Sequence, residues 1–191
     1  MPTTPMTTAA SVAQVPVRAD EREDAQRERL ARCYRDHGPR LARQIVAITG
    51  NPSCVEDLVN ETFIRAHEHF DRFEDRSALS TWLHGIAINV ARAHVAKRSR
   101  RRRLDAALPE PARQGEDVED AVRGREAVRR LYLALDQLDA DLRVAFVLCV
   151  LEQRSLKEGS ALLGVPVSTL HARRQRAEAF VRAQIEGEGE P

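Results

Sequence analysis

Residues 57–63 read DLVNETF, residues 81–92 read TWLHGIAINVAR and residues 97–103 read KRSRRRR, and the rest of the chain is arranged around this stretch. Apolar side chains recur at 3.6-residue spacing through the first segment, which predicts a helix whose opposite face is acidic. The second segment has its own apolar stripe and continues into the arginine cluster. An acidic helix followed by a basic one, with aromatic side chains between them, indicates two adjacent binding surfaces, one for a basic protein surface and one for a polyanion.

The composition favours an aliphatic, helical protein. The 191-residue chain is long enough for one or two domains, and it is 42% hydrophobic but only 4% aromatic. Its 30 Lys and Arg nearly balance its 29 Asp and Glu, so net charge alone does not indicate a nucleic-acid binder. The three cysteines are scattered, which argues against a disulfide framework and a zinc site and fits a reducing cytoplasm. No apolar run reaches the ~20 residues of a membrane span, and no signal-peptide pattern is present, so we expect a soluble cytoplasmic protein without membrane insertion.

The pattern predicts an all-α fold of two small helical domains that are joined by a flexible acidic linker. Residues 1–20 are rich in Thr, Ala and Pro, and we expect a disordered tail. In the first domain we expect a helix that is interrupted at Gly38-Pro39 and a following helix that is capped by Ser53. The domain boundaries that follow from this pattern are residues 21–103, a linker at 104–124, a second domain at 125–185 and a tail at 186–191.

The second domain has the pattern of a helix-turn-helix. Residues 155–163 and 168–185 are expected helices, and Gly164-Val165-Pro166 is the short turn between them. The second of these helices is dense in arginine. Its expected buried stripe contains Val167, Leu170, Ala177 and Val181. Its expected outward face, suited to a major groove, contains Ser168, Thr169, Ala172, Arg173 and Arg176.

The arginine run at 100–103 is the strongest signal for nucleic acid, although it is not specific. Guanidinium groups fit phosphates in a bidentate manner, and binding of this kind weakens with salt. The alternative is a solvated helix end whose cations complement the helix dipole. Trp82 can stack on an unpaired base or fill the core, and Asn89 can read a base edge or be an ordinary surface residue.

The sequence contains no arrangement that is typical of catalysis. The six histidines form no metal-ligand spacing, and no nucleophile–base pair or glycine-rich phosphate loop is present. We therefore expect a protein that is not an enzyme and that uses no cofactor and no metal.

Together these residues resemble the extracytoplasmic-function (ECF) group of bacterial RNA polymerase sigma factors. The segment Glu56–Phe63, with Phe73, Thr81–Leu83, Ile86-Ala87 and Asn89, is similar to region two of that family. The segment Leu138–Leu151, with Ser155, Leu163–Pro166, Thr169 and Arg173, is similar to region four. The resemblance covers roughly residues 25–103 and 125–183, which is all but the tails and the linker.

The resemblance implies a factor that binds core RNA polymerase, directs it to specific promoters and promotes melting of the −10 element. Asp57, Asn60 and Glu61 would contact the clamp helices of the largest catalytic subunit, and the second domain would contact the flap of the other large subunit. The acidic linker would extend toward the active-site cleft. The free protein would be a monomer that an anti-sigma factor holds inactive.

Two sets of residues would contact promoter DNA if the resemblance holds. The −10 set contains Arg72, Phe73, Ser77, Trp82, Asn89, Arg92, Lys97, Arg98, Arg100 and Arg101. The −35 set contains Ser168, Thr169, His171, Arg173 and Arg176.

Five positions depart from the family pattern. Asn60 stands where Gln is usual, Ala93 replaces a polar residue, and His171 replaces a frequent Arg. Gly159 lies inside a helix, where glycine costs ~1 kcal/mol, and Arg174 falls on the buried stripe, from which its charged head would have to reach outward.

Three rival functions stay open on the residues alone. A helix-turn-helix repressor or activator would use the second domain for DNA and the first for dimerisation. A regulatory interaction protein would bind polymerase without binding a promoter. An enzyme that acts on nucleic acid fits least, because no acid–base or metal set is present. Whether specific DNA binding requires polymerase separates these functions.

Overall fold

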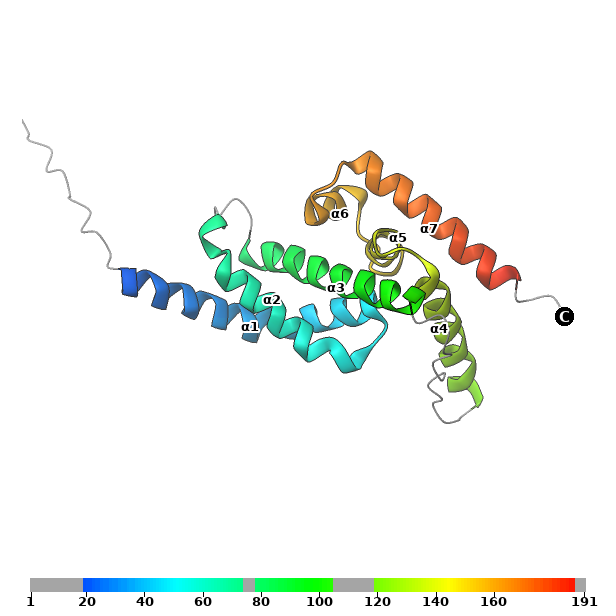
Figure 1. Ribbon diagram of the computed structural model, residues 1–191, viewed down its shortest axis with the longest axis horizontal. Coiled ribbons are helices and arrows are strands. Elements are labelled where there is room, and N and C mark those ends of the chain that lie inside the picture. Colours follow the sequence, from blue (N-terminus) through cyan, green and yellow to red (C-terminus); the bar gives the residue numbers. More distant parts are fainter. Residues whose placement is uncertain (1–18, 74–77, 105–118, 188–191) are drawn as a thin grey trace, which may run out of the picture.

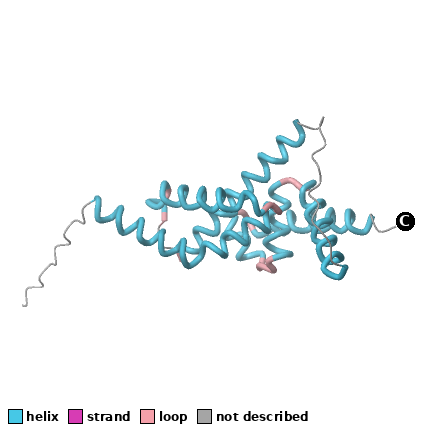
Figure 2. Tube along the Cα trace, turned by 90° about the horizontal axis from the view of Figure 1, so that it is seen from below, coloured by secondary structure: helices cyan, strands magenta, loops and turns pink. Residues whose placement is uncertain are grey.

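The computed structural model describes residues 19–73, 78–104 and 119–187, and within these ranges the chain is helical with short connections and no strand (Figure 1, Figure 2). The first group of helices is α1 (Ala19–Thr49), α2 (Val55–Glu68) and α3 (Leu79–Leu104). The second group is α4 (Glu119–Gln137), α5 (Ala140–Phe146), α6 (Leu156–Leu163) and α7 (Val167–Gly187). The predicted all-α class with two helical domains is confirmed.

Helix α1 continues through the predicted break at Gly38-Pro39, so that prediction was wrong. A proline inside a helix removes one hydrogen bond and costs about 3 kcal/mol. Packing on both sides of the proline offsets this cost. Before it, Leu30 and Cys33 are buried in a cluster with Ala66 of α2 and Leu83 of α3. After it, the buried residues of α1 are Leu41, Ile45 and Ile48.

The connection from α1 to α2 differs from the predicted Ser53 cap. A short 3₁₀ turn, η1 (Pro52–Cys54), precedes α2, and the side chain of Asn51 accepts a hydrogen bond from the backbone N–H of Ser53 at 3.0 Å. Cys54 stands immediately before α2 and makes no side-chain cap. Asn51 therefore caps the turn, and Ser53 is a donor within it.

The predicted helix-turn-helix is confirmed in α6 and α7. Ser155 caps α6 by accepting from the backbone N–H of Glu158, and the Glu158 carboxylate accepts from Ser155 in return. Gly164 ends α6 in the left-handed conformation, with φ of 63°, which glycine adopts without strain.

Before α6, α5 passes directly into a π-helical segment, η3 (Val147–Leu151). Residues 105–118 of the predicted linker lie outside the described part of the chain. Helix α4 begins at Glu119, inside the range 104–124 that was predicted for the linker.

The two groups of helices pack directly against each other. Helix α3 lies between α1 and α2 on one side and α5 and α6 on the other (Figure 1). The α3–α6 contact is close at Gly85, where an added Cβ would lie 3.3 Å from the backbone oxygen of Leu162. One continuous core spans both groups. From the first group it includes Leu41, Ile45, Ile88, Ala91 and Val95, and from the second Val144, Val147, Leu148 and Leu170.

Candidate nucleic-acid interface

An aromatic cluster forms at the start of α3, beside the turn η2 (Phe70–Arg72). The Trp82 ring lies 6.2 Å from the Phe70 ring and 5.3 Å from the Phe73 ring, measured between centroids. The guanidinium of Arg29 lies over both phenylalanine rings, at 5.3 and 5.7 Å. All three aromatic residues are half-buried, and Phe70 and Trp82 pack against the core around Leu83. The cluster thus combines core packing with a partly exposed aromatic surface next to a cation, which is suited to stacking an unpaired base.

The side chains that follow on α3 are polar and basic. Asn89 is exposed on α3, two turns after Trp82. Lys97, Arg100 and Arg101 are exposed at the end of the helix, and none of them pairs with an acidic group of the described residues. The same helix therefore presents an aromatic cluster, an amide and a cationic end in sequence order.

Arg92 of α3 differs from these cations because it is paired with the second group of helices. Its guanidinium donates to Asp141 of α5 at 2.9 Å. The other carboxylate oxygen of Asp141 accepts from Arg173 of α7 at 2.6 Å. One carboxylate thus links the predicted −10 helix to the predicted −35 helix.

A second carboxylate makes a similar link at the end of α3. Asp136 of α4 accepts hydrogen bonds from Arg98, from Arg102 at 2.9 Å and from Arg143 of α5. Burial alone would raise the pKa of Asp136, but the hydrogen bond and charge of Arg143, together with Arg98 and Arg102, hold this pKa below its usual value. Asp136 is therefore an anion at neutral pH, surrounded by guanidinium groups.

Arg143 connects this carboxylate to the end of α1. Its side chain is fully buried, and its Nε donates to the backbone oxygen of Ile48 at 2.5 Å. Its guanidinium also lies 5.9 Å from the ring of Tyr132, whose hydroxyl donates to the backbone oxygen of Ala47 at 3.4 Å. Residues of the second group thus satisfy backbone carbonyls at the C-terminal end of α1, which have no partner within the helix.

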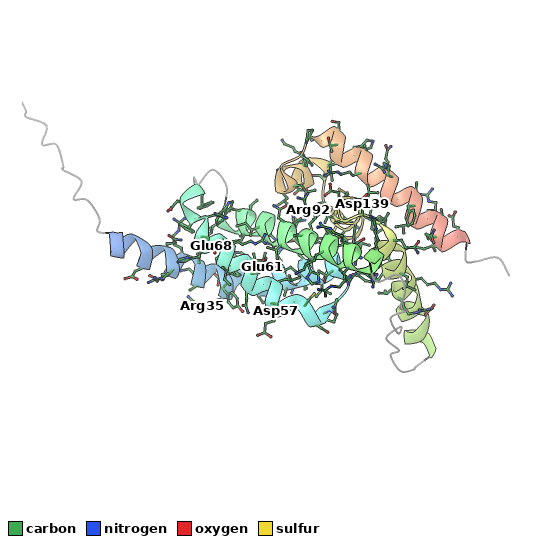
Figure 3. All side chains as sticks on the ribbon, in the orientation of Figure 1. Arg35, Asp57, Glu61, Glu68, Arg92 and Asp139 are labelled. Atoms are coloured by element: carbon green, nitrogen blue, oxygen red, sulfur yellow. The ribbon has the colours of Figure 1, made fainter. Side chains whose placement is uncertain are left out.

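These contacts surround a groove between α3, α5 and α7. Arg92 on α3 and Asp139 at the start of α5 both line it (Figure 3). Asn89 lines the same groove, and Arg173 and Arg176 line it from α7. Two residues of the predicted −10 set and two of the predicted −35 set therefore line the same groove.

Helix α7 follows its predicted faces at most positions. Leu170, Ala177 and Val181 are buried as predicted, but Val167 is 46% exposed because it is the first residue of the helix. Ser168, His171 and Arg176 are exposed, Thr169 is half-buried, and Arg173 is held by Asp141.

The two unusual residues of the helix-turn-helix have structural explanations. Gly159 is buried where α6 crosses α7, and an added Cβ would lie 2.7 Å from a methyl group of Leu170. The glycine permits this close crossing. Arg174 is half-buried, and its guanidinium pairs with Glu178 one turn later at 2.7 Å.

The predicted polymerase-binding residues lie on α2, on the side of the molecule away from α7. Asp57 and Asn60 are exposed, and Asp57 points outward (Figure 3). Glu61 pairs with Arg65 at 2.6 Å. Beside them, Ile64 is 59% exposed, so this face combines carboxylates with an apolar side chain. Two residues of the predicted −10 set cannot be placed, because Ser77 and the side chain of Arg72 lie outside the described residues.

The sequence matches known families over both groups of helices. Residues 33–101 match the family described as Sigma-70 region 2, and residues 128–181 match Sigma-70, region 4. Over 153 residues the chain is 33% identical to the ECF RNA polymerase sigma factor SigE of Mycolicibacterium smegmatis, a match that covers 78% of this chain and 58% of that relative. Over 141 residues it is 30% identical to the ECF RNA polymerase sigma-E factor of Escherichia coli strain K12, covering 69% of this chain and 74% of the relative.

The chain belongs to the extracytoplasmic-function sigma factors. It is thus a member of the group that gives RNA polymerase its promoter specificity in transcription initiation.

Solved structures share the sigma-factor fold. The structure of CnrH in complex with the cytosolic domain of CnrY has a TM-score of 0.59 at 23% identity and covers 90% of this chain and 96% of that one. The sigma factor RpoE in complex with the anti-sigma factor NepR from Bartonella quintana has a TM-score of 0.54 at 24% identity and covers 86% of this chain and 98% of that one.

Sequence reasoning missed the residues that join the two domains of this sigma factor. The signal for Arg143 was a single arginine inside an otherwise apolar run, which is expected only if a buried partner is present. Asp136 and Asp141 carried no such signal, because nothing local distinguishes them from other surface carboxylates of a helix.

Among the described residues, no group of three or more His, Cys, Asp or Glu could hold a metal ion. None of the helices described has the length and apolar character needed to cross a bilayer.

Proposed function

We propose that this sigma factor docks on core RNA polymerase through α2, holds the melted −10 element on α3 and reads the −35 element with α7. The observation that carries the proposal is the order of side chains along α3. The aromatic cluster at its start can stack unpaired bases, Asn89 can read a base edge, and Lys97, Arg100 and Arg101 can hold phosphates. Stacking energy offsets the cost of opening the duplex, so the chain needs no catalytic group and acts by binding alone.

The α2 face is the proposed polymerase contact. Asp57 and Asn60 are exposed there and Glu61 is partly exposed, and we assign them to the clamp helices of the largest catalytic subunit. The second domain is assigned to the flap of the other large subunit. Ile64 beside the carboxylates supports a protein partner, because interface cores combine apolar contacts with a polar rim.

An anti-sigma factor is the proposed regulator. The solved structure of RpoE contains the anti-sigma factor NepR, and that of CnrH contains the cytosolic domain of CnrY. By this likeness we place the present chain with an anti-sigma partner, and in the cytoplasm, where polymerase and promoters are found.

The experiment that tests the proposal is run-off transcription from fragmented genomic DNA of the source organism. Core polymerase is supplied alone, with the protein, with Asn89→Ala or with the control Gln137→Ala, which removes an exposed amide from the end of α4. We expect discrete transcripts that require the protein, that fall about tenfold with Asn89→Ala because one base-edge contact is lost, and that stay unchanged with the control. If core polymerase yields the same transcripts with and without the protein, the proposal is wrong.

A further inference from the structure

We propose that Arg29 of α1 is a further residue of the −10 surface, a positioning residue that holds the rings of Phe70 and Phe73 where an unpaired base stacks. This assignment rests on the proposed function, because that function gives the aromatic cluster at the start of α3 to unpaired bases. It adds a third element to the −10 surface, since none of the predicted −10 residues lies on α1.

The backbone around Arg29 is fixed against α2 and α3. Leu30, the next residue, is buried in one core cluster with Leu83 of α3. About one turn before Arg29, the side-chain amide of Gln26 donates to the backbone oxygen of His67 at 3.0 Å, near the end of α2. Helix α1 therefore holds the exposed side chain of Arg29 beside the turn η2, which follows α2 directly.

The guanidinium of Arg29 contacts two rings at once. Its central carbon lies 5.3 Å from the ring centroid of Phe70 and 5.7 Å from that of Phe73. A cation within about 6 Å of a ring centroid is attracted by the negative face of the ring. A guanidinium is also planar and stacks on aromatic faces, whereas the ammonium of lysine is a compact point charge. Arg29 therefore holds the two rings together and limits how far they can separate.

Phe73 depends on this contact more than its neighbours do. Phe70 and Trp82 pack against the buried core around Leu83, which holds both rings without Arg29. Among the described residues, the ring contacts of Phe73 are with Phe70 at 5.9 Å, with Trp82 at 5.3 Å and with the guanidinium of Arg29. Loss of the guanidinium should therefore displace Phe73 first, and with it the surface that Phe73 and Trp82 offer to a base.

The placement of the rings matters because stacking uses ring faces that are already ordered. Unpaired bases bind aromatic side chains face to face. A side chain that becomes ordered only on binding lowers the affinity, and one that is held in its bound position beforehand avoids this cost. Arg29 thus strengthens stacking without touching the base, and its role is separate from the phosphate contacts assigned to Lys97, Arg100 and Arg101.

The first test compares Arg29→Gln and Arg29→Lys with the wild type and the control Arg32→Gln. Arg32 lies on the same helix and is exposed, and it pairs with Glu28 at 3.2 Å, so the control loses the same charge away from the two rings. Arg29→Lys keeps the charge that a phosphate contact would need but loses the planar guanidinium.

The measurement is the affinity of each holoenzyme, assembled with core polymerase, for a fork duplex whose −10 strand is unpaired. The fork comes from a promoter found by run-off transcription, and a series of forks replaces one −10 base at a time with an abasic site. We expect Arg29→Gln to bind the intact fork about fivefold more weakly than Arg32→Gln, and Arg29→Lys about fivefold more weakly than the wild type. Both differences should disappear on the fork that lacks the stacked base.

Two results of this measurement would overturn the proposal. If Arg29→Lys binds like the wild type, the residue supplies a charge and does not position rings. If the defect of Arg29→Gln is equal on every fork, the variant has lost structure or charge in general and no stacked base is involved.

The second test examines the ring cluster in the free chain, without polymerase or DNA. Trp82 is the only tryptophan of the chain, so its fluorescence reports on this cluster alone. We expect acrylamide to quench Trp82 more efficiently in both Arg29 variants than in the wild type or Arg32→Gln, because a displaced Phe73 uncovers the indole. Equal quenching in all four proteins would show that Phe73 does not depend on Arg29, and the proposal would be wrong.

The two tests separate failure of this inference from failure of the proposed function. If run-off transcription yields no protein-dependent promoter while quenching differs as expected, the proposed function fails together with the base-stacking role, and the ring contact of Arg29 is kept. If the wild-type holoenzyme binds the fork and the Arg29 variants bind it like their controls, the proposed function stands and the role of Arg29 is wrong.

Discussion

At the scale of single residues, Arg143 is a charged side chain that the fold buries completely. It reaches Asp136 and the backbone oxygen of Ile48, and its second amino group has no hydrogen-bond partner among the described residues. Burial lowers the pKa of Arg143, while the hydrogen bond and charge of Asp136 oppose the shift. The guanidinium therefore depends on Asp136 for its compensation.

Replacing Asp136 is expected to destabilise the fold strongly. Asp136→Asn leaves Arg143 buried without a counter-ion, and breaking a buried pair from one side costs about 3 kcal/mol or more. Urea denaturation followed by circular dichroism gives the free energy of unfolding. The control Glu126→Gln breaks partly exposed pairs within one helix and should leave that free energy nearly unchanged. Equal values for the two variants would show that Arg143 does not need Asp136.

His84 predicts how stability depends on pH. It is buried, and its Nδ1 lies 2.8 Å from the Gln44 side-chain oxygen, while Gln44 donates to Glu152 at 3.4 Å. Burial, followed by the charges of Arg40, Arg154 and His37, lowers the pKa of His84 from 6.5 to about 4. The folded protein therefore favours neutral His84, whereas the unfolded chain binds a proton below about pH 6.5.

The contribution of His84 to the free energy of unfolding should consequently be constant above pH 6.5. It should fall as the pH drops from 6.5 toward 4, by about 3 kcal/mol in total. The measurement is the free energy of unfolding across this range for the wild type and His84→Gln, which cannot bind the proton. His94, whose pKa is also lowered by burial, remains in both proteins. Parallel curves for the two proteins would contradict the prediction.

At the scale of elements, the crossing of α6 and α7 depends on Gly159. An added Cβ there would lie 2.7 Å from a methyl group of Leu170, which is itself fully buried. We expect Gly159→Leu to destabilise the protein by about 1–3 kcal/mol, because the crowded helices must move apart. Gly159→Ala should be milder, because alanine recovers about 1 kcal/mol of helix propensity. Thermal unfolding of both variants checks the order, and a Leu variant as stable as wild type would contradict it.

Local signals predicted those elements that local chemistry defines. The helix-turn-helix was predicted because Gly164-Val165-Pro166 marks a short turn between two helical patterns, and the structure adds the capping box of Ser155 and Glu158 at the start of α6. The break at Gly38-Pro39 was wrong because packing against α2 and α3, which no local pattern reveals, outweighs the proline. The sequence also identified the polar character of α3, but not that Arg92 and Arg98 are paired with carboxylates from another domain.

At the scale of the whole molecule, the packing of the two groups of helices depends on contacts between residues far apart in the chain. Arg98 and Asp136 are 38 positions apart, and Arg143 and Ile48 are 95 positions apart. Periodicity and capping describe neighbours within a few turns, so no pattern of that kind could place these groups together. The two domains were predictable, and their mutual contact was not.

Under the proposed function, polymerase would supply surfaces that bind the two domains, and its binding energy would favour the arrangement in which the domains are separated. Promoter recognition should therefore be coupled to polymerase, whereas a repressor of the same fold would recognise its site alone.

The most direct test of this coupling is the affinity for a promoter duplex obtained from the run-off experiment, compared with a scrambled duplex, with and without core polymerase. We predict that the free chain binds both duplexes weakly and about equally, and that core polymerase makes binding to the promoter at least about a hundredfold tighter than to the scrambled duplex. If the free chain alone distinguishes the two duplexes to the same extent, the protein is a helix-turn-helix regulator and its proposed coupling to polymerase is wrong.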